Sequence, residues 1–546
     1  MVEIPAWGFH HDPAAARIIH YWPHSGFGAA NWCVTHCRLT IRRELCLVLY
    51  DKIVSTTKKL DRTLVSGIAW TAMLRWVAQG LSWCATFFVA RLLVPGDYGI
   101  VSMATIGIGL LRMVEDFGLD SILIQDRSIV GEQQARLAGL ILTVGAGFCA
   151  VFLVLAQPIA VFFHEAQVRW AIVGLSVLFV TDALQVVPRA TLQRELDFRR
   201  FAMLAFVQTL ATQSVLVAAA EAKWGYWALI SGSIAGGVAS TVLLLAWRPY
   251  RVAWPRELAK LARPLLQGWR VIAGRIAWYG FNTADQTIAG RMLGKDALGA
   301  YSFATTFASL PFQEAGSIVG RVVPGIFSVV QTNPVELRRY FLMLTEFLTY
   351  ITLPLSVGLA LTSDLAVGVA LGPQWTAVVQ PLRLLCVYAA FQGCQILVSH
   401  VLMWTGQFRT IMWCTILAAV AMPLGFLGAA SHGLPGLALV WAVLYPIVNI
   451  PPLVIGFRII NVSLRDWLAA LKPAACASLV MIAAVLAVRR VLPASQGLLA
   501  SLVIVVTVGA LAYAAVLWFA FRARVLEMLR FVRPPRDNPL PAAQVP

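Results

Sequence analysis

The chain has 546 residues, of which 59% are hydrophobic and only 13% are charged, and its mean hydropathy is +0.75. A soluble domain carries roughly 25% charged residues, so this composition excludes a water-soluble globular protein and indicates that the bilayer is the solvent. The formal net charge of +17 would suit a nucleic-acid-binding protein, but the placement of the basic residues described below argues against a nucleic-acid partner.

Residues 1–60 differ from the rest of the chain because they lack a sustained apolar run. We expect a poorly ordered cytoplasmic extension without a signal peptide, or a translation start that really lies later, near Val54. Five of the eight histidines and three cysteines lie in this segment. A zinc site formed by Cys33, His36 and Cys37 is the alternative interpretation, but the spacing does not match a structural zinc site, so no metal is expected.

Apolar runs of about 20 residues, enough to cross a hydrocarbon core of about 30 Å, recur along the rest of the chain. We predict fourteen spans, at residues 63–90, 98–118, 135–163, 168–190, 201–221, 225–247, 264–290, 297–323, 338–362, 376–402, 409–430, 434–457, 467–488 and 497–521. The second, eighth and tenth spans are interrupted by Arg112, Glu115, Asp116, Glu314 and Arg383.

Basic residues alternate between successive connections. Those on one side hold most of them, including Lys58, Lys59, Arg62, Arg194, Arg199, Arg200, Arg248, Arg251, Arg256, Lys260, Arg338, Arg339, Arg465, Lys472, Arg522 and Arg524. The opposite connections hold only Arg91, Arg169, Lys223, Arg291, Lys295, Arg489 and Arg490. The positive-inside rule therefore predicts a multi-pass protein with both termini in the cytoplasm and an even number of spans.

Two segments 200 positions apart resemble each other. Arg91–Ser102 and Arg291–Ser302 share Arg, Leu, Gly and Ser at matching positions, and the match extends upstream to Gly80/Gly280 and Arg75/Arg275. A membrane protein with repeated halves is typically a carrier whose binding site lies between the halves. The offset accommodates six spans, an even number, so the two repeats are predicted to be parallel.

The predicted fold is an all-α integral membrane protein with about 14 transmembrane helices, arranged as two parallel six-helix repeats and two further helices. We expect a first bundle at 61–247, a basic cytoplasmic linker at 248–263, a second bundle at 264–460, two additional spans at 461–523 and a basic, Pro-rich cytoplasmic tail at 524–546. The linker mixes basic, aromatic and Pro residues, which fits an interfacial helix; a plain loop is the alternative.

Two arginines are predicted near the middle of the membrane. Arg75 lies about eleven residues into the first span and Arg275 equally deep in the seventh, where a charge costs at least about 2.5 kcal/mol. Each begins a polar stripe at helical spacing: Arg75, Gln79, Ser82 and Thr86 in one half, and Arg275, Tyr279, Asn282 and Gln286 in the other. These stripes predict a polar cavity between the halves. In the alternative, each arginine only joins helices by pairing with a carboxylate such as Asp116 or Glu314.

Acidic residues inside spans are candidates for ion coupling, because desolvation favours their protonated form. Our choices are Asp285, Glu314 and Asp116; an ion pair or a capped helix end is the alternative for each. Arg321 and Arg383 would add positive potential to the cavity, or extend to the membrane interface. No nucleophile elbow, paired-acid loop, phosphate loop or metal-ligand cluster is present in the sequence, so neither an enzyme nor a cofactor is predicted.

Several sequence segments resemble those of the polysaccharide transporter family. They are Ala90–Gly99, Asp116–Leu119 with Ile124 and Gln125, Arg194–Arg200, Asn282–Asp285 leading to Gly290–Gly294, Gly320–Pro324 and Leu371–Trp375. The family is the Wzx-type, colanic-acid-exporter-like flippase group of the multidrug/oligosaccharidyl-lipid/polysaccharide exporter superfamily. The resemblance covers residues from about 60 to 525, and residues 1–60 depart from it.

The resemblance implies a fourteen-helix protein of the bacterial inner membrane that flips undecaprenyl-pyrophosphate-linked oligosaccharide repeat units by alternating access, in exopolysaccharide or lipopolysaccharide biosynthesis. Its expected partners are that substrate, membrane lipids and the polysaccharide polymerase and export machinery. Arg75, Arg275, Arg321 and Arg383 would bind the pyrophosphate by charge-assisted hydrogen bonds, and Gln79, Asn282 and Gln286 would face the sugars. A multidrug or small-molecule antiporter would prefer an acidic cavity. A membrane glycosyltransferase or polymerase would need a large external loop.

Overall fold

The computed structural model describes residues 70, 73–115, 131–195, 197–254, 276, 278–330, 333–493 and 496–532. The chain divides into two compact units, Met1–Arg75 and Trp76–Pro546. Of the first unit only Trp70 and residues 73–75 are described, so the zinc and alternative-start hypotheses lie outside the described residues.

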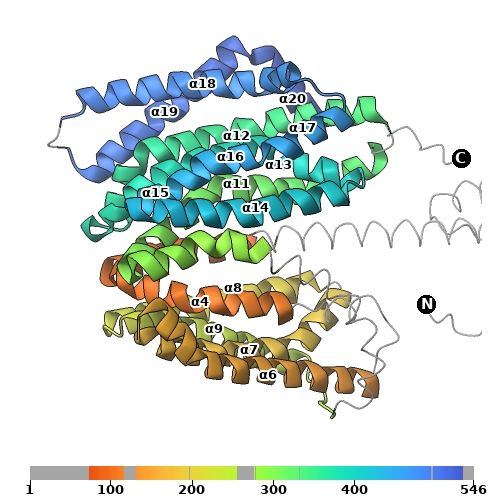
Figure 1. The fold of residues 1–546 in the computed structure, drawn as a ribbon, viewed down its shortest axis with the longest axis vertical. Helices are drawn as coiled ribbons and strands as arrows, with labels where there is room; N and C mark the ends of the chain where they lie inside the picture. Colours follow the sequence, from red (N-terminus) through yellow and green to blue (C-terminus); the bar gives the residue numbers. More distant parts are fainter. Residues whose placement is uncertain are drawn as a thin grey trace, which may run out of the picture. The chain divides into compact units, whose positions relative to one another are not determined.

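The first repeat forms a helical bundle, drawn in orange to yellow in Figure 1. It consists of a helix at 73–92, α4 (Pro95–Glu115), α6 (Glu132–Phe163), α7 (Gln167–Arg194), α8 (Phe198–Glu221) and α9 (Tyr226–Trp247). The Asp197 side chain caps α8 by accepting a hydrogen bond of 3.0 Å from the Arg200 backbone N–H, as expected for an N-cap aspartate. Gly225, at φ +57°, makes the tight connection from α8 to α9.

The second repeat starts with a helix at 278–288 that continues into the π-helix η2 (Ala289–Leu293). It then contains α11 (Lys295–Val330), α12 (Pro334–Ala370), the short 3-10 helix η3 (Pro373–Val378), α13 (Val379–Trp404) and α14 (Phe408–Ala429). The last predicted span of this repeat is divided into five short helical segments. They are η4 (Ala430–His432), α15 (Gly433–Leu439), the π-helix η5 (Val440–Leu444), α16 (Tyr445–Val448) and α17 (Ile450–Ile459). Asn333 caps α12 by accepting from two backbone N–H groups.

Two more helices, α18 (Leu464–Val491) and α19 (Leu498–Ala520), pack against each other and against α12, and Figure 1 shows them in blue at the side of the second bundle. Ser463 and Asp466 form a reciprocal capping box that begins α18. The chain continues as α20 (Arg522–Val532), so the first residues of the predicted tail are helical.

The all-α membrane fold is confirmed: the described residues contain no strand, and nine helical segments among them are long and apolar enough to cross a membrane. Each of the fourteen predicted spans overlaps a helix in the described residues, with ends that differ by a few residues. The number fourteen itself stays a prediction. Of the predicted linker, residues 248–254 have no helical structure; the rest lies outside the described residues.

One hydrophobic cluster joins the two bundles. It contains Ile100 and Met103 from α4, Phe152 from α6, and Tyr301 and Trp375 from the second repeat, all nearly inaccessible to solvent. Helices α4 and α11 form the main contact between the bundles. Neither is among the nine described segments that are long and apolar enough to cross a membrane, and both contain charged residues, such as Asp97 and Arg112 in α4 and Arg321 in α11.

Candidate transport site

Helices α4 and α11 cross at matching positions of the two repeats. A β-carbon added to Gly99 would lie 1.9 Å from the Lys295 carbonyl oxygen, and one added to Gly299 would lie 1.8 Å from the Pro95 carbonyl oxygen. Only glycine allows two backbones to approach so closely. One turn further along, the Ser302 hydroxyl donates a hydrogen bond of 3.0 Å to the Ser102 hydroxyl oxygen. These four residues, Gly99, Ser102, Gly299 and Ser302, form what we call the repeat contact.

The connection before α4 binds the second repeat beside the repeat contact. Gln374 Nε2 donates to the carbonyl oxygens of Ala90 (2.9 Å) and Leu93 (3.1 Å), and Trp375 Nε1 donates to that of Ala90 (2.7 Å). Trp375 is fully buried and packs edge-on against Tyr98, at 5.4 Å between ring centroids. The α12–α13 connection is thus docked onto the first repeat by a buried indole donor, Trp375, and by an amide donor of the exposed Gln374.

The equivalent connection, before α11, also contacts the other repeat, through charged side chains. Lys295 Nζ lies 3.1 Å from a Glu165 carboxylate oxygen, and Arg291 contacts the His164 ring. His164 and Glu165 belong to the α6–α7 connection, which corresponds to the α12–α13 connection of the second repeat. Arg291 lies on η2, where the wider π-turn redirects the side chains. Contacts on both sides of the repeat contact therefore close the same end of the two bundles.

The predicted polar stripe of the second repeat partly faces the first. The Tyr279 hydroxyl donates to the Ile106 carbonyl oxygen of α4 at 2.8 Å. The same hydroxyl packs against Gly109, where an added β-carbon would lie 2.1 Å from it. Asn282 is partly exposed and its Nδ2 donates to the Trp278 carbonyl oxygen of its own helix at 2.9 Å, and Gln286 is also partly exposed. On the first stripe Gln79 is exposed, and Ser82 accepts a hydrogen bond of 3.2 Å from Gln213.

The predicted arginines have different surroundings. Arg75 is exposed, Arg321 belongs to α11, and Arg275 lies outside the described residues. Arg383 does not stand as a free cation: its Nη2 lies 3.3 Å from Asp364 Oδ1, and its Nε donates to Ser363 Oγ at 2.9 Å. Asp364 is shared with Arg489 of α18, which contacts both carboxylate oxygens. This network ties α12, α13 and α18 together, and substrate binding by Arg383 stays a prediction.

The three acidic residues predicted to couple transport to an ion also differ in their surroundings. Asp116 lies outside the described residues and Glu314 belongs to α11. Asp285 is 2% exposed, and its carboxylate accepts three hydrogen bonds: from the Tyr301 hydroxyl (2.9 Å) and Trp441 Nε1 (2.7 Å) at Oδ2, and from the Gln286 backbone N–H (2.8 Å) at Oδ1. A buried carboxylate requires such partners.

An aromatic cluster surrounds this carboxylate within the second repeat. Trp441 lies on the π-helix η5 and packs against Tyr388, at 4.8 Å between centroids. Tyr388 also packs against Tyr445, whose hydroxyl donates to Gln392 Oε1 at 2.7 Å. Sequence reasoning missed Trp441 and Tyr301 as partners of Asp285. A tryptophan 156 positions away carries no local signal, whereas Tyr301 lies inside the repeated phrase, where its polar group could have been noted.

These features define a multi-pass membrane protein built from two helical repeats that meet through a duplicated contact. Residues 88–380, more than half of the chain, match the family model of the polysaccharide biosynthesis proteins. The chain belongs to that family, and the resemblance seen in the sequence is confirmed.

The chain is similar to named relatives of this kind. It is 26% identical over 334 residues to the lipopolysaccharide biosynthesis protein WzxC of Escherichia coli (strain K12), covering 60% of this chain and 67% of WzxC. It is 24% identical over 376 residues to the succinoglycan biosynthesis transport protein ExoT of Rhizobium meliloti (strain 1021), covering 68% of this chain and 74% of ExoT.

Two solved structures share the fold. The lipid II flippase MurJ in an inward closed conformation gives a TM-score of 0.66 at 12% identity, over 83% of this chain and 99% of that chain. An inward-facing multidrug resistance MATE family transporter of the MOP superfamily gives 0.52 at 14% identity, over 70% of this chain and 94% of that chain. At such identities the likeness shows the fold alone. It places this chain in a many-helix transporter architecture.

Proposed function

We propose that this protein is a flippase that moves undecaprenyl-pyrophosphate-linked oligosaccharide repeat units across the bacterial inner membrane by alternating access, in exopolysaccharide or lipopolysaccharide biosynthesis. Membership of the polysaccharide biosynthesis family supports the substrate class. Similarity to ExoT, a succinoglycan biosynthesis transport protein, and to the fold of the lipid II flippase MurJ supports it as well. The observation that carries the mechanism is the repeat contact, because a two-fold-related contact that closes one end of two parallel repeats is what alternating access opens and closes.

The side that is closed follows from the charge pattern. The repeat contact lies beside the connections of Arg91 and Arg291, on the side with few basic residues, which the positive-inside rule assigns to the periplasm. In this proposal the structure is closed toward the periplasm and both termini are cytoplasmic. A substrate made in the cytoplasm would then enter from the basic side.

The headgroup would bind to arginines between the repeats. Arg75 and Arg275 occupy matching positions, and Arg321 lies on α11. Guanidinium groups can hold pyrophosphate oxygens by bidentate hydrogen bonds, while the lipid tail stays in the bilayer. Gln79, Asn282 and Gln286 would offer uncharged donors and acceptors to the sugars.

Asp285 is our first choice for ion coupling, with Glu314 and Asp116 as the other candidates. Its carboxylate connects the helix at 278–288 with α11 and η5 through Tyr301 and Trp441. The indole N–H can only donate, so protonation of the carboxylate, which removes its negative charge, would weaken the hydrogen bond that Trp441 donates. A change in the charge of one carboxyl group would thereby alter the packing of three helices in the second repeat.

A glycan assay tests the function. In a strain that keeps its glycosyltransferases and polymerase, deletion of this gene should leave lipid-linked repeat units inaccessible to an impermeant lectin added to spheroplasts, and the wild-type gene should restore labelling. Loss of a polymerase would instead leave single repeat units labelled. A multidrug antiporter, the alternative that shares the fold, would change drug susceptibility and leave the glycan unaffected; that result would overturn the proposal.

A further inference from the structure

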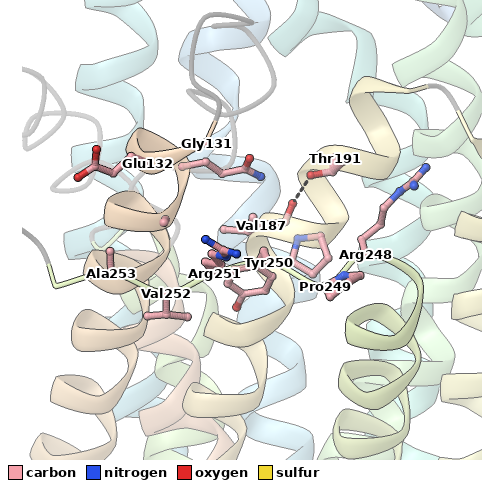
Figure 2. A pocket seen from close by; sticks show the side chains of 13 residues that line it. Gly131, Glu132, Val187, Thr191, Arg248, Pro249, Tyr250, Arg251, Val252 and Ala253 are labelled. Atoms are coloured by element: carbon pink, nitrogen blue, oxygen red, sulfur yellow. Dashed lines mark hydrogen bonds between the residues drawn. The ribbon is translucent and has the colours of Figure 1, made fainter.

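A cavity of about 650 Å³ lies at one end of the first bundle, on elements that do not take part in the repeat contact. Its walls are the first turn of α6, the last turns of α7 and a non-helical segment, Arg248–Ala253, which we call the strap. Figure 2 shows these lining side chains. The strap directly follows α9, a helix able to span the membrane that ends at Trp247. The cavity therefore lies at the level of the lipid headgroups.

The strap is held in place on both sides of Arg251. The Ala253 backbone N–H donates to the Ala135 carbonyl oxygen of α6 at 2.9 Å, and the Tyr250 hydroxyl donates to the Leu184 carbonyl oxygen of α7 at 3.0 Å. Burial raises the pKa of Tyr250 above its usual value, so the hydroxyl remains a donor. The backbone at Arg251 is thus held beside the cavity by its neighbours, and the exposed Arg251 side chain is available to a ligand.

The charges around the cavity leave one cation without a partner. Arg248 is paired with Glu195, and Glu132 is paired with Arg136 at 2.6 Å. Within the described part of the chain, Arg251 makes no such pair. In Figure 2 the Arg251 guanidinium lies among the lining residues, whereas that of Arg248 points away from them.

The wall formed by α6 adds to this positive potential. Gly131 precedes the helix at φ +62° and offers no side-chain cap, so the first backbone N–H groups of α6 are free to donate to an acceptor in the cavity. Arg251, Gln134 and the first residues of α6, Glu132 among them, line the same space. Guanidinium groups and the backbone N–H groups of a helix N-terminus bind phosphate oxygens.

We propose that the strap cavity binds the phosphate headgroup of a membrane lipid, with Arg251 as the principal ligand. Two lipids carry this chemistry at this depth: a bulk anionic phospholipid and an undecaprenyl diphosphate. Phosphate recognition is common to both, and the inference does not depend on the proposed flippase function, because lipid retention can be measured without transport.

The test uses the full chain, purified in a neutral detergent and studied by native mass spectrometry with added lipids. Dioleoyl phosphatidylglycerol should bind about tenfold more tightly than dioleoyl phosphatidylcholine. Arg251→Gln should reduce this preference to near unity, and Arg251→Lys should keep most of it because the charge remains. The control is Arg199→Gln, which removes an exposed arginine from the first turn of α8 on the same membrane face.

A second variant, Thr191→Trp, should weaken binding by filling the cavity without a change of charge, since Thr191 lines it. Competition with undecaprenyl diphosphate separates the two sources: displacement of phosphatidylglycerol below equimolar amounts assigns the site to the polyprenyl diphosphate, and weaker displacement assigns it to phospholipid. Unchanged binding by Arg251→Gln, or an equal loss in Arg199→Gln, would overturn the proposal. Size-exclusion profiles establish that each variant is folded.

Discussion

Ser302 donates a hydrogen bond of 3.0 Å to Ser102, the residue that occupies the same position in the other repeat. The repeated phrase in the sequence is therefore also the place where the repeats touch. Two glycines in that phrase, Gly99 and Gly299, bring the backbones together. Selection for a close crossing between α4 and α11 explains why small residues stand at matching positions of both repeats.

Gly299→Ala should abolish the closed state of this end. Its β-carbon would lie 1.8 Å from the Pro95 carbonyl oxygen, and because the obstacle is backbone, α4 and α11 must separate. We expect export to fall by at least about tenfold, corresponding to roughly 1.4 kcal/mol, with normal membrane abundance. Gly280→Ala is the matched control, because a β-carbon there meets nothing within 4 Å. Equal export by both variants would contradict a role for the crossing.

A double substitution of Ser102 and Ser302 by cysteine should allow the repeat contact to be locked. The two hydroxyl oxygens lie 3.0 Å apart, so the β-carbons are near the range of a disulfide, about 3.5 to 4.5 Å. Oxidation should stop export and a reducing agent should restore it. Each single cysteine variant, treated in the same way, provides the control; export that is insensitive to oxidation in a demonstrably cross-linked protein would argue against alternating access.

Arg75→Ala and Arg275→Ala should each abolish export while membrane abundance stays near normal. The reason is the loss of a charge-assisted ligand for the pyrophosphate, which contributes about 1.5 to 3 kcal/mol per hydrogen-bonded charged group. Lipid-linked repeat units should accumulate on the cytoplasmic leaflet in both strains. Wild-type export by both variants would remove the pyrophosphate-binding role of the two arginines.

Asp285→Asn should uncouple export from its driving gradient. Asparagine keeps one acceptor oxygen for Trp441 or Tyr301 but has no charge to neutralise, so dependence on an imposed proton or sodium gradient should disappear in proteoliposomes. Trp441→Phe loses a donor and leaves the carboxyl group, and so it should slow transport without removing gradient dependence. Retained gradient dependence in Asp285→Asn would transfer the coupling role to another acid, such as Glu314.

Arg383→Gln should affect stability rather than transport. The Arg383 side chain is 47% exposed and pairs with Asp364, and partly exposed pairs contribute about 1 kcal/mol or less. We expect a small decrease of the melting temperature measured in detergent, and unchanged export per folded molecule. Loss of export at full stability would return Arg383 to the set of substrate ligands.

The sequence alone determined that the protein lies in a membrane, where its helices lie along the chain and that it consists of two repeats. Runs of about 20 apolar residues fix a helix wherever the bilayer offers no other partner for the backbone. The match of Gly99 with Gly299 predicted that the two halves of the chain are structural repeats. Asp285 was recognisable as an acidic residue inside a predicted span, where a charge needs partners.

Only the tertiary structure decided which side chains meet. Trp441, which lies on the π-helix η5, donates to Asp285 across 156 positions of sequence. Arg383 was predicted to add positive potential to the cavity; in the structure it pairs with Asp364 of α12, which also pairs with Arg489 of α18. Helical periodicity gives the face on which a residue lies, but not the neighbour that this face meets. That neighbour depends on the packing of all helices together, and on the need of each buried polar group for a partner.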